Sequence, residues 1–207
     1  MKNINSKKTY HHGDLKKALI AASLRLLEEE GYQSFSLRKV AKLAGVSQAA
    51  PYRHYKDQES LIADVACEGF VLLAEKLQKI RNKFKNSSLL QFRESGLAYV
   101  EFALRHPDLF QIMYGNQIQN HSEYPTLRQS EDLPFQILLD IISETKKEGR
   151  LVAVDIQKTT IAAWTMVHGI AMLLLGKQVM FRSSNLKEAK QMTKELIEQL
   201  YTGLKKH

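Results

Sequence analysis

The stretch SLRKVAKLAGVSQAAPYRHYK, residues Ser36 to Lys56, decides the fold predicted for this chain. Ser36 is a suitable N-cap for a helix whose apolar residues share one side and which stops at Gly45. Ser47, two residues after Gly45, is the predicted N-cap of another helix. Two short helices joined by a tight turn through Gly45 match the helix-turn-helix, whose second helix enters the DNA major groove.

Three details of this stretch favour DNA binding over a plain helical hairpin. Arg38 and Lys39 lie in the first turn of their helix, where the helix dipole disfavours cations, and a phosphate at that helix end would remove the conflict. The small residues that begin the next helix, Gln48-Ala49-Ala50, allow close approach to base edges.

Pro51 falls at the fourth position of that helix, so we expect it to remove only the first intrahelical hydrogen bond.

The rest of the chain also reads as helices. Asp14 and Gly31 predict the N-cap and C-cap of a helix over residues 14–30, and Asp57 caps a longer helix after the helix-turn-helix. Further helical patterns cover Ser88–Arg105, a short piece after Pro107, Leu127–Glu148 ended by Gly149, Asp155–Lys177 and Leu186–Lys205, with a polar loop at Asn116–Pro125. No alternating apolar run argues for a sheet, so the predicted fold is all-α.

The charge of the 207-residue chain is concentrated in its first quarter. Residues 1–56 hold 11 Lys and Arg against 4 Asp and Glu, whereas the remaining 151 residues hold 19 against 18. A basic module on a neutral body suggests a polyanion partner for the module alone, although a lysine-rich solvated face is the alternative.

Other features bound the class of protein. The single cysteine, Cys67, forms no internal disulfide, which fits a reducing compartment. MKNINSKKTY lacks the apolar core of a signal peptide, and the longest mostly apolar stretch, Ile161–Leu175, has 15 residues where a membrane span needs about 20. We therefore expect a cytoplasmic protein.

Catalytic and metal chemistry have little support in the sequence. The chain contains no H-E-x-x-H, nucleophile elbow or phosphate-binding loop, and one cysteine with scattered histidines provides no metal ligand set. We expect no enzyme activity, no cofactor and no metal. A helical adaptor that binds proteins, or a non-specific DNA-packaging protein, are the rival functions. The adaptor requires neither the concentrated basic charge nor the small-residue start at Gln48, whereas a packaging protein would bind all DNA sequences alike.

The segment Leu15–Leu61 resembles the DNA-binding domain of TetR-family transcriptional regulators. The resemblance covers about the first third of the chain and combines the capping Ser36, the Ala-Gly-Val-Ser turn and the Tyr-x-His-aromatic end. The later Trp164–Gly169, WTMVHG, is similar to the C-terminal signature of a WHG-type subgroup. The resemblance implies a DNA-binding domain over residues 1–57, with residues 1–10 as a flexible basic arm, and a helical effector-binding and dimerisation domain over residues 58–207.

The resemblance also implies roles for single residues in DNA binding. Base edges would be contacted by Arg38, Gln48, Ala49 and Ala50, Arg suiting guanine and Gln suiting adenine. The phosphate backbone would be held by Ser36, Lys39, Ser47, Tyr52, Arg53, His54 and Lys56. Tyr55, which precedes the next helix cap, is expected in the core. The chain has Gln58 where the family usually has lysine, which removes one expected phosphate contact.

The last two predicted helices carry the signs of a dimer interface. One face of Asp155–Lys177 holds Ala162, Thr165, Gly169 and Gly176, and a glycine inside a helix costs about 1 kcal/mol relative to alanine unless close packing requires it. A second apolar stripe on the same helix indicates that both sides are buried. We expect a partner subunit on the first face, joined by Leu196, Leu200 and Leu204. The resemblance likewise implies a four-helix bundle between two copies.

A small-molecule effector is the remaining partner that the resemblance implies. The effector would bind in a cavity of the C-terminal domain and weaken the binding of the protein to a palindromic operator. The protein would then be a repressor that its effector releases from DNA. The candidate lining residues are aromatic, apolar or weakly polar, which favours a largely apolar effector, and a place in the ordinary core is the alternative for each: Cys67, Tyr99, Phe102, Phe110, Met113, Tyr114, Trp164 and His168.

Overall fold

A computed structural model describes residues 12–152, 155–176 and 185–204 of the chain. Within these ranges the protein is helical and contains no strand, which confirms the predicted all-α class. The α-helices are α1 (His12–Glu30), α2 (Leu37–Leu43), α3 (Gln58–Lys83), α4 (Ser88–Arg105), α5 (Pro107–Tyr114), α6 (Pro125–Lys147), α7 (Ile156–Leu175) and α8 (Leu186–Leu204). The predicted basic arm of residues 1–10 lies outside the described residues.

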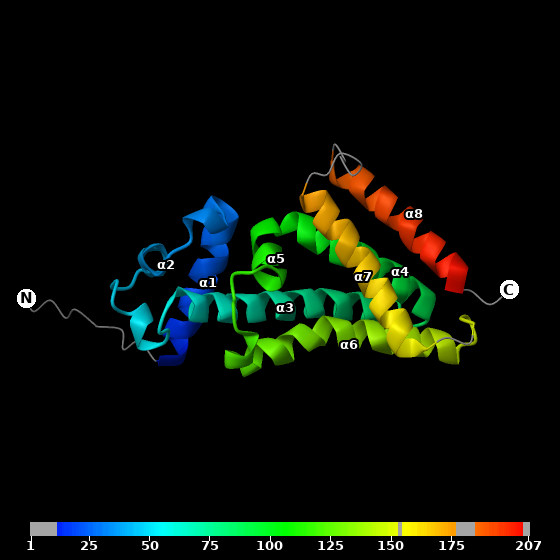
Figure 1. The fold of residues 1–207 in the computed structure, drawn as a ribbon, viewed down its shortest axis with the longest axis horizontal. Helices are drawn as coiled ribbons and strands as arrows, with labels where there is room; N and C mark the ends of the chain where they lie inside the picture. The colour runs from blue at the N-terminus through cyan, green and yellow to red at the C-terminus, as the bar shows by residue number, and fades with distance from the viewer. Residues whose placement is uncertain (1–11, 153–154, 177–184, 205–207) are drawn as a thin grey trace, which may run out of the picture.

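The long helix α3 runs through the middle of the molecule and connects its two ends (Figure 1). Its first turns lie beside α1, which carries α2 on its other side, and the rest packs against α4, α5 and α6. Helices α7 and α8 cover α4 on the outside, at the end away from α1. The helix-turn-helix and the proposed dimer helices therefore occupy opposite ends of one elongated body.

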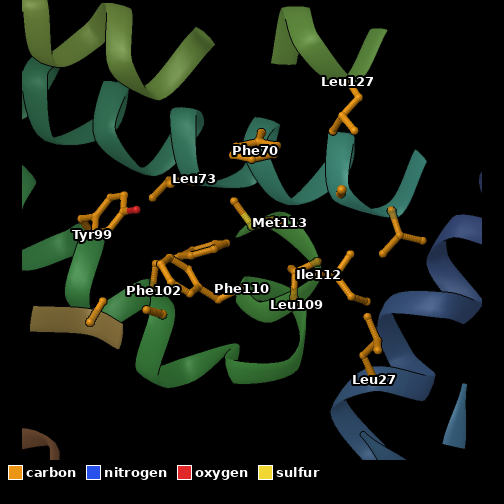
Figure 2. Close-up of a cluster of buried hydrophobic side chains, with 14 of the residues drawn as sticks. Leu27, Phe70, Leu73, Tyr99, Phe102, Leu109, Phe110, Ile112, Met113 and Leu127 are labelled. Carbon is orange, nitrogen blue, oxygen red and sulfur yellow. The ribbon is translucent and has the colours of Figure 1, made fainter. Parts of the chain in front are cut away.

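One hydrophobic core joins the two ends (Figure 2). Leu27 of α1 lies near Leu109 and Ile112 of α5, while Phe70 of α3 lies near Met113. All five side chains are at most 5% exposed. The predicted boundary between residues 57 and 58 falls at the start of α3, a helix that packs against both ends, and it stays a prediction.

Several predicted helix ends are confirmed. Ser36 accepts a hydrogen bond from the Lys39 amide, and Asp57 forms a reciprocal capping box with Ser60. Gly31, Gly45 and Gly149 all have φ near +70°, a conformation that glycine adopts without strain. The cap predicted at Asp14 is wrong: α1 begins at His12, so Asp14 lies inside the helix.

Helix α7 is longer than the apolar stretch from which the absence of a membrane span is predicted. It spans 20 residues with a mean hydropathy of 1.3 over its most apolar part, so by length and composition alone it would reach across a membrane. The stretch Ile161–Leu175 is shorter because it begins beyond the first turn of the helix. Helix α7 instead packs against α4, α6 and α8, with Thr160, Ala171 and Ile170 buried there. Its other face is exposed.

Candidate nucleic-acid interface

The turn after α2 has the geometry that the sequence predicts. Helix α2 ends at Leu43, and the amides of Gly45 and Val46 donate to the carbonyls of Lys42 and Ala41 at 3.1 and 3.0 Å. Gly45 has φ +69°, and an added Cβ there would meet nothing within 4 Å. Glycine is therefore required by the backbone conformation of this turn and not by lack of space.

The segment after Gly45 differs from the prediction. Instead of an α-helix capped by Ser47, it forms consecutive tight turns that end in a 3-10 helix, Pro51–Arg53. The amide of Ala50 donates to Ser47 at 3.0 Å, and that of His54 donates to Pro51 at 2.9 Å. Pro51 has no N–H to donate to the carbonyl of Ser47, so the α-helical bond expected at this position is missing and the three-residue turn replaces it.

Most residues expected to contact DNA are on the surface of this segment. Eight are exposed: Arg38, Lys39, Ser47, Gln48, Ala49, Tyr52, Arg53 and Lys56. Tyr52 is 61% exposed, which is unusual for a large aromatic side chain. Ser36 and His54 are half-buried. Between Gly45 and Lys56 the exposed side chains with hydrogen-bond donors are Ser47, Gln48, Tyr52, Arg53 and Lys56.

Ala50 was expected to contact bases, and this expectation is wrong. Its side chain is 8% exposed and belongs to the hydrophobic core, next to the buried Pro51. The tight turns direct Ala50 inward, while Gln48 and Ala49 stay outside. A methyl group inside the core is unavailable to a thymine methyl group.

Tyr55 anchors this surface to the rest of the molecule. It is 3% exposed, as predicted, and its burial together with the nearby Asp64 carboxylate raises the pKa of its hydroxyl well above the ordinary value. Asp64 of α3 also pairs with Lys16 of α1, with 2.9 Å between Nζ and Oδ2. The burial of Tyr55 attaches the DNA-facing segment to the core, and the Lys16–Asp64 pair joins α1 to α3 beside it.

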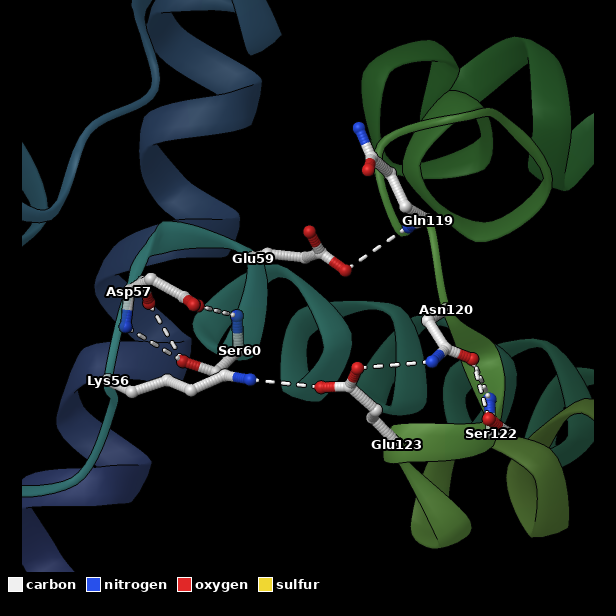
Figure 3. Close-up of polar contacts among 8 residues, drawn as sticks. All are labelled: Lys56, Asp57, Glu59, Ser60, Gln119, Asn120, Ser122 and Glu123. Carbon is white, nitrogen blue, oxygen red and sulfur yellow. Dashed lines mark hydrogen bonds and ion pairs between the residues drawn. The ribbon is translucent and has the colours of Figure 1, made fainter.

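Two of the candidate phosphate-binding lysines are paired with carboxylates in this structure. Lys39 Nζ lies 2.6 Å from Glu30, at the end of α1. Lys56 Nζ lies 3.0 Å from Glu123 in the 3-10 turn before α6, as Figure 3 shows. Both pairs are solvent-exposed, so phosphate can exchange with the carboxylates at little energetic cost.

Two contacts that sequence reasoning missed attach the DNA-facing end to the body. The amide of Tyr32 donates to Asp108 Oδ1 at 2.8 Å, in the first turn of α5. The Gln119 amide donates to Glu59 Oε1 at 3.1 Å, beside the Lys56–Glu123 pair (Figure 3). The partners lie 60 to 76 residues apart in sequence, and no local spacing signals them.

Five of the eight candidate effector residues form one aromatic cluster. Tyr99, Phe110, Tyr114, Trp164 and His168 have ring centroids 4.8 to 6.4 Å apart. Tyr99 Oη lies 2.9 Å from His168 Nδ1. Burial lowers the pKa of His168 and raises the pKa of Tyr114 to about 12. The neutral forms of both side chains are therefore favoured at neutral pH.

The other three candidates take different positions. Phe102 and Met113 are 3% and 2% exposed in the core around Phe110 (Figure 2). Cys67 of α3 is half-buried, and burial raises the pKa of its thiol. None of these three lines the small cavity that Tyr99 and Trp164 line between α4, α6 and α7. Met113, Tyr114 and Trp164 line a larger neighbouring cleft of about 470 Å³.

The predicted dimer face is uncovered in the single chain. Ile161, Met172 and Leu173 of α7 are 52%, 47% and 37% exposed, and they lie on the same face as three predicted interface residues that are also exposed: Ala162, Thr165 and Gly176. Gly169, Leu196, Leu200 and Leu204 are half-buried.

Glycine occupies positions 169 and 176 of this face for different reasons. A Cβ at Gly169 would meet nothing within 4 Å, so no contact inside this chain explains that glycine. Gly176 follows the last residue of α7 as its C-cap, so the cost of a glycine inside a helix does not apply to it.

Among the residues that the structure describes, no group of three His, Cys, Asp or Glu side chains is placed to hold a metal ion. The features that stand out are therefore an exposed basic segment at one end, an aromatic cluster beside a cavity, and an uncovered apolar face at the other end.

Two family models match the chain. Residues 19–65 match "Bacterial regulatory proteins, tetR family", and residues 92–200, more than half of the chain, match "Tetracyclin repressor-like, C-terminal domain". The subgroup suggested by Trp164–Gly169 stays a prediction.

Solved structures agree with these matches. A protein with unknown function from Rhodococcus sp. RHA1 is 28% identical, with a TM-score of 0.81, covering 97% of this chain and 100% of that one. A bacterial regulatory protein in the tetR family from Rhodococcus RHA1 is 15% identical, with a TM-score of 0.68 and coverages of 93% and 98%. A ketosteroid transcriptional regulator of Mycobacterium tuberculosis is 15% identical, with a TM-score of 0.61 and coverages of 96% and 98%. The last two show similarity of fold.

Proposed function

The chain belongs to the TetR family of bacterial regulatory proteins, DNA-binding transcriptional regulators that are not enzymes, and we propose that it is a repressor that binds a palindromic operator as a homodimer in the cytoplasm. The observation that carries the proposal is the exposed segment from Gly45 to Lys56, where a capped helix, a glycine turn and a row of donor side chains form one surface. A helical adaptor has no need for such a surface.

Different residues in and before this segment contact the phosphate backbone and the bases. Tyr52, Arg53 and Lys56 hold the phosphate backbone, since all three are exposed and two carry positive charge. Arg38 and Gln48 contact base edges, where their side chains form bidentate hydrogen bonds with guanine and adenine. Lys39, Ser36, Ser47 and His54 complete the phosphate contacts. Ala49 makes a close apolar contact, and Ala50 supports the segment from inside.

Dimerisation through α7 and α8 follows from the uncovered face. An apolar helix face of this size in water favours association with another apolar surface, and the glycine at position 169 allows a second helix to approach closely. The same face on a second copy is self-complementary, as a two-fold axis requires. Two copies then present two DNA-binding segments for half-sites about 34–36 Å apart.

Release from DNA is proposed to follow effector binding among α4, α6 and α7. An effector acts only if it favours a conformation that DNA disfavours. Two connections link this region to the DNA-facing end: α4 leads to α5 and the Asp108–Tyr32 contact, and α6 leads through Glu131 and His121, 2.7 Å apart, to Glu123 and Lys56. A shift of either helix is thereby transmitted to the DNA-binding segment.

Selection of bound genomic fragments tests this function. Purified protein is incubated with sheared genomic DNA, and the retained fragments are sequenced. We expect enrichment of a short palindrome. Uniform, strongly salt-sensitive retention without a shared sequence indicates a DNA-packaging protein instead, and no retention at any salt concentration contradicts DNA binding.

A further inference from the structure

A small apolar cavity lies between α4, α6 and α7, closed by single residues of α3 and α8. It has a volume of about 30 Å³. Its walls are mainly hydrocarbon, with Phe92, Ile137, Ile141, Val167 and Ile197 among them. None of the described residues that line it is charged.

Ser95, on α4, is one of the few side chains in this wall that carry a polar atom. Its side chain is 4% exposed, and its Oγ has no hydrogen-bond partner. Other serines inside helices of this protein donate to the carbonyl four residues earlier: Ser23 to Leu19 at 2.8 Å, and Ser143 to Leu139 at 2.8 Å. Ser95 departs from this pattern, and it is one of the residues that line the cavity.

A buried hydroxyl without a partner destabilises the folded protein, because it no longer forms hydrogen bonds to water. A water molecule in the cavity is a poor replacement, since an ordered buried water needs two to four polar partners and the wall offers chiefly Ser95. Tyr99 Oη, which also lines the cavity, is already engaged with His168. A ligand with one hydrogen-bonding atom satisfies Ser95 and covers the hydrocarbon walls.

The cavity can be enlarged because two of its wall residues separate it from the cleft of about 470 Å³. Trp164 and Pro134 line both spaces. The Trp164 ring is half-buried and stacks on His168, with 4.9 Å between ring centroids. Pro134 lies inside α6 and has no N–H for the carbonyl of Ser130, which makes α6 easier to bend there. Rotation of Trp164 would join the two spaces.

We propose that this enlarged cavity binds a neutral, mainly hydrocarbon molecule whose single hydroxyl or carbonyl hydrogen-bonds to Ser95, and that this molecule is the effector. The effector role rests on the proposed function; the binding site does not. A charged ligand is excluded from the cavity because no opposite charge in its wall compensates the loss of water. The ligand displaces Trp164 and Pro134, and thereby acts on α7 and α6.

Trp164 is the single tryptophan of the chain, so its fluorescence reports binding directly. The neutral probe is 1-octanol, and octanoate at pH 7.5 is its charged counterpart. Octanol is expected to give a saturable change in Trp164 emission, with octanoate at least about tenfold weaker. No saturable change with octanol, or equal affinity for octanoate, overturns the proposed ligand class.

The variant Ser95→Ala tests the anchor. Loss of one neutral hydrogen bond is expected to weaken octanol binding about 3- to 10-fold. The same variant should raise the Tm of the ligand-free protein by about 2–4 °C, because it removes an unsatisfied buried hydroxyl. Ser143→Ala, whose Oγ is bonded to a carbonyl outside the cavity wall, is the matched control and should leave octanol affinity unchanged. Unchanged affinity in Ser95→Ala overturns the assignment of Ser95.

The effector role is tested separately on a DNA fragment obtained by the genomic selection. Octanol is expected to lower the affinity of the wild-type protein for that fragment, and to do so at higher concentration in Ser95→Ala. Octanol that binds beside Trp164 without lowering DNA affinity overturns the effector role, while the site stands. A protein that retains no DNA contradicts the proposed function, and the fluorescence titration still decides the binding site.

Discussion

A single carboxylate, Asp108, forms one of the polar contacts between the DNA-facing end and the body. It accepts a hydrogen bond from the Tyr32 amide at 2.8 Å. The adjacent Gly31 has φ +73°, and a Cβ added there would lie 3.3 Å from Asp108 Oδ1. Its position in the first turn of α5 places a negative charge near the positive end of the helix dipole. One side chain thereby fixes the junction of α1 with α5.

Replacing this carboxylate should destabilise the fold. In Asp108→Ala the part-buried amide of Tyr32 loses its acceptor, and we expect the free energy of unfolding to fall by about 1–3 kcal/mol. Asp108→Asn keeps an acceptor oxygen and should lose less than half as much. Urea unfolding followed by circular dichroism measures both. Equal losses in the two variants would show that the hydrogen bond is not the source of the stability.

Exposed residues of the DNA-binding segment should affect DNA binding without affecting folding. Tyr52 is 61% exposed, so Tyr52→Ala should change stability by less than about 0.5 kcal/mol. The variant should weaken binding to all DNA sequences alike, about tenfold for one charge-assisted hydrogen bond. Arg38→Ala should instead lose about 1–3 kcal/mol of discrimination at one base pair. Binding assays on operator variants measure the difference, and an unchanged base preference in Arg38→Ala contradicts its role.

At the scale of helices and turns, the local signals at Ser36, Asp57 and Gly45 are confirmed, the caps predicted at Asp14 and Ser47 are wrong, and the distant contacts were not predicted. The caps Ser36 and Asp57 and the glycine Gly45 act through hydrogen bonds and backbone angles within three or four residues, so the sequence shows them directly. The inward direction of Ala50 depends on how consecutive turns before Pro51 rotate the chain, which spacing alone does not give. Ser95 carried no signal, because an unpaired hydroxyl becomes visible only when its surroundings are known.

The turn before α6 makes a separable contribution to DNA binding. Lys56→Ala should reduce the slope of log affinity against log salt concentration by about 0.9 for each phosphate that the lysine no longer neutralises. Glu123→Gln leaves Lys56 free for phosphate and should keep the wild-type slope, with equal or a few-fold higher affinity. Salt titrations of operator binding compare the two variants. A reduced slope in Glu123→Gln contradicts the competition between Glu123 and phosphate.

A charged cluster between α3, α4 and α8 predicts a pH dependence of stability. The Glu101 carboxylate lies 3.0 Å from Lys190 Nζ and 2.8 Å from Arg105 Nε, with Lys76 Nζ at 3.7 Å. Burial raises the pKa of Glu101, but the hydrogen bonds from Lys190 and Arg105 outweigh it, so the pKa lies below the ordinary value. A carboxyl whose pKa is lower when folded stabilises the protein above its unfolded pKa of about 4.3, and this stabilisation is lost as pH falls through the folded pKa.

Glu101→Gln should therefore reduce the free energy of unfolding by about 1 kcal/mol at pH 7, with the difference from wild type shrinking as the pH falls below about 4. Urea unfolding at a series of pH values between 7 and 3 measures this. Glu29→Gln, in the more exposed pair with Arg25, is the control and should have little effect at any pH. A Glu101→Gln difference that stays constant down to pH 3 contradicts the pKa direction.

At the scale of the whole molecule, two functional ends are held apart by one continuous core. The DNA-facing segment packs on α1 and the start of α3, while the uncovered apolar face lies on α7 and α8 at the far end (Figure 1). The long helix α3 and the buried cluster along it make the intervening body stiff. Association at one end can therefore set the distance between two DNA-binding segments at the other.

A charge placed on the α7 face should prevent this association. Thr165 is exposed in the single chain, so Thr165→Arg should leave folding intact while setting like charges against each other across the two-fold axis. Gln78→Arg, at an exposed position of α3, is the matched control. Sedimentation analysis is expected to show a dimer for wild type and Gln78→Arg and a monomer for Thr165→Arg. A dimeric Thr165→Arg variant places the interface elsewhere.

The number of chains on one operator tests most directly whether two copies contact DNA together. The selected palindrome and a duplex carrying only one half-site are titrated with protein, and the mass of each complex is determined. We expect two chains, or a multiple of two, on the palindrome at concentrations where the single half-site binds at least about a hundredfold more weakly. One chain per palindrome, or equal affinity for the half-site, contradicts the account.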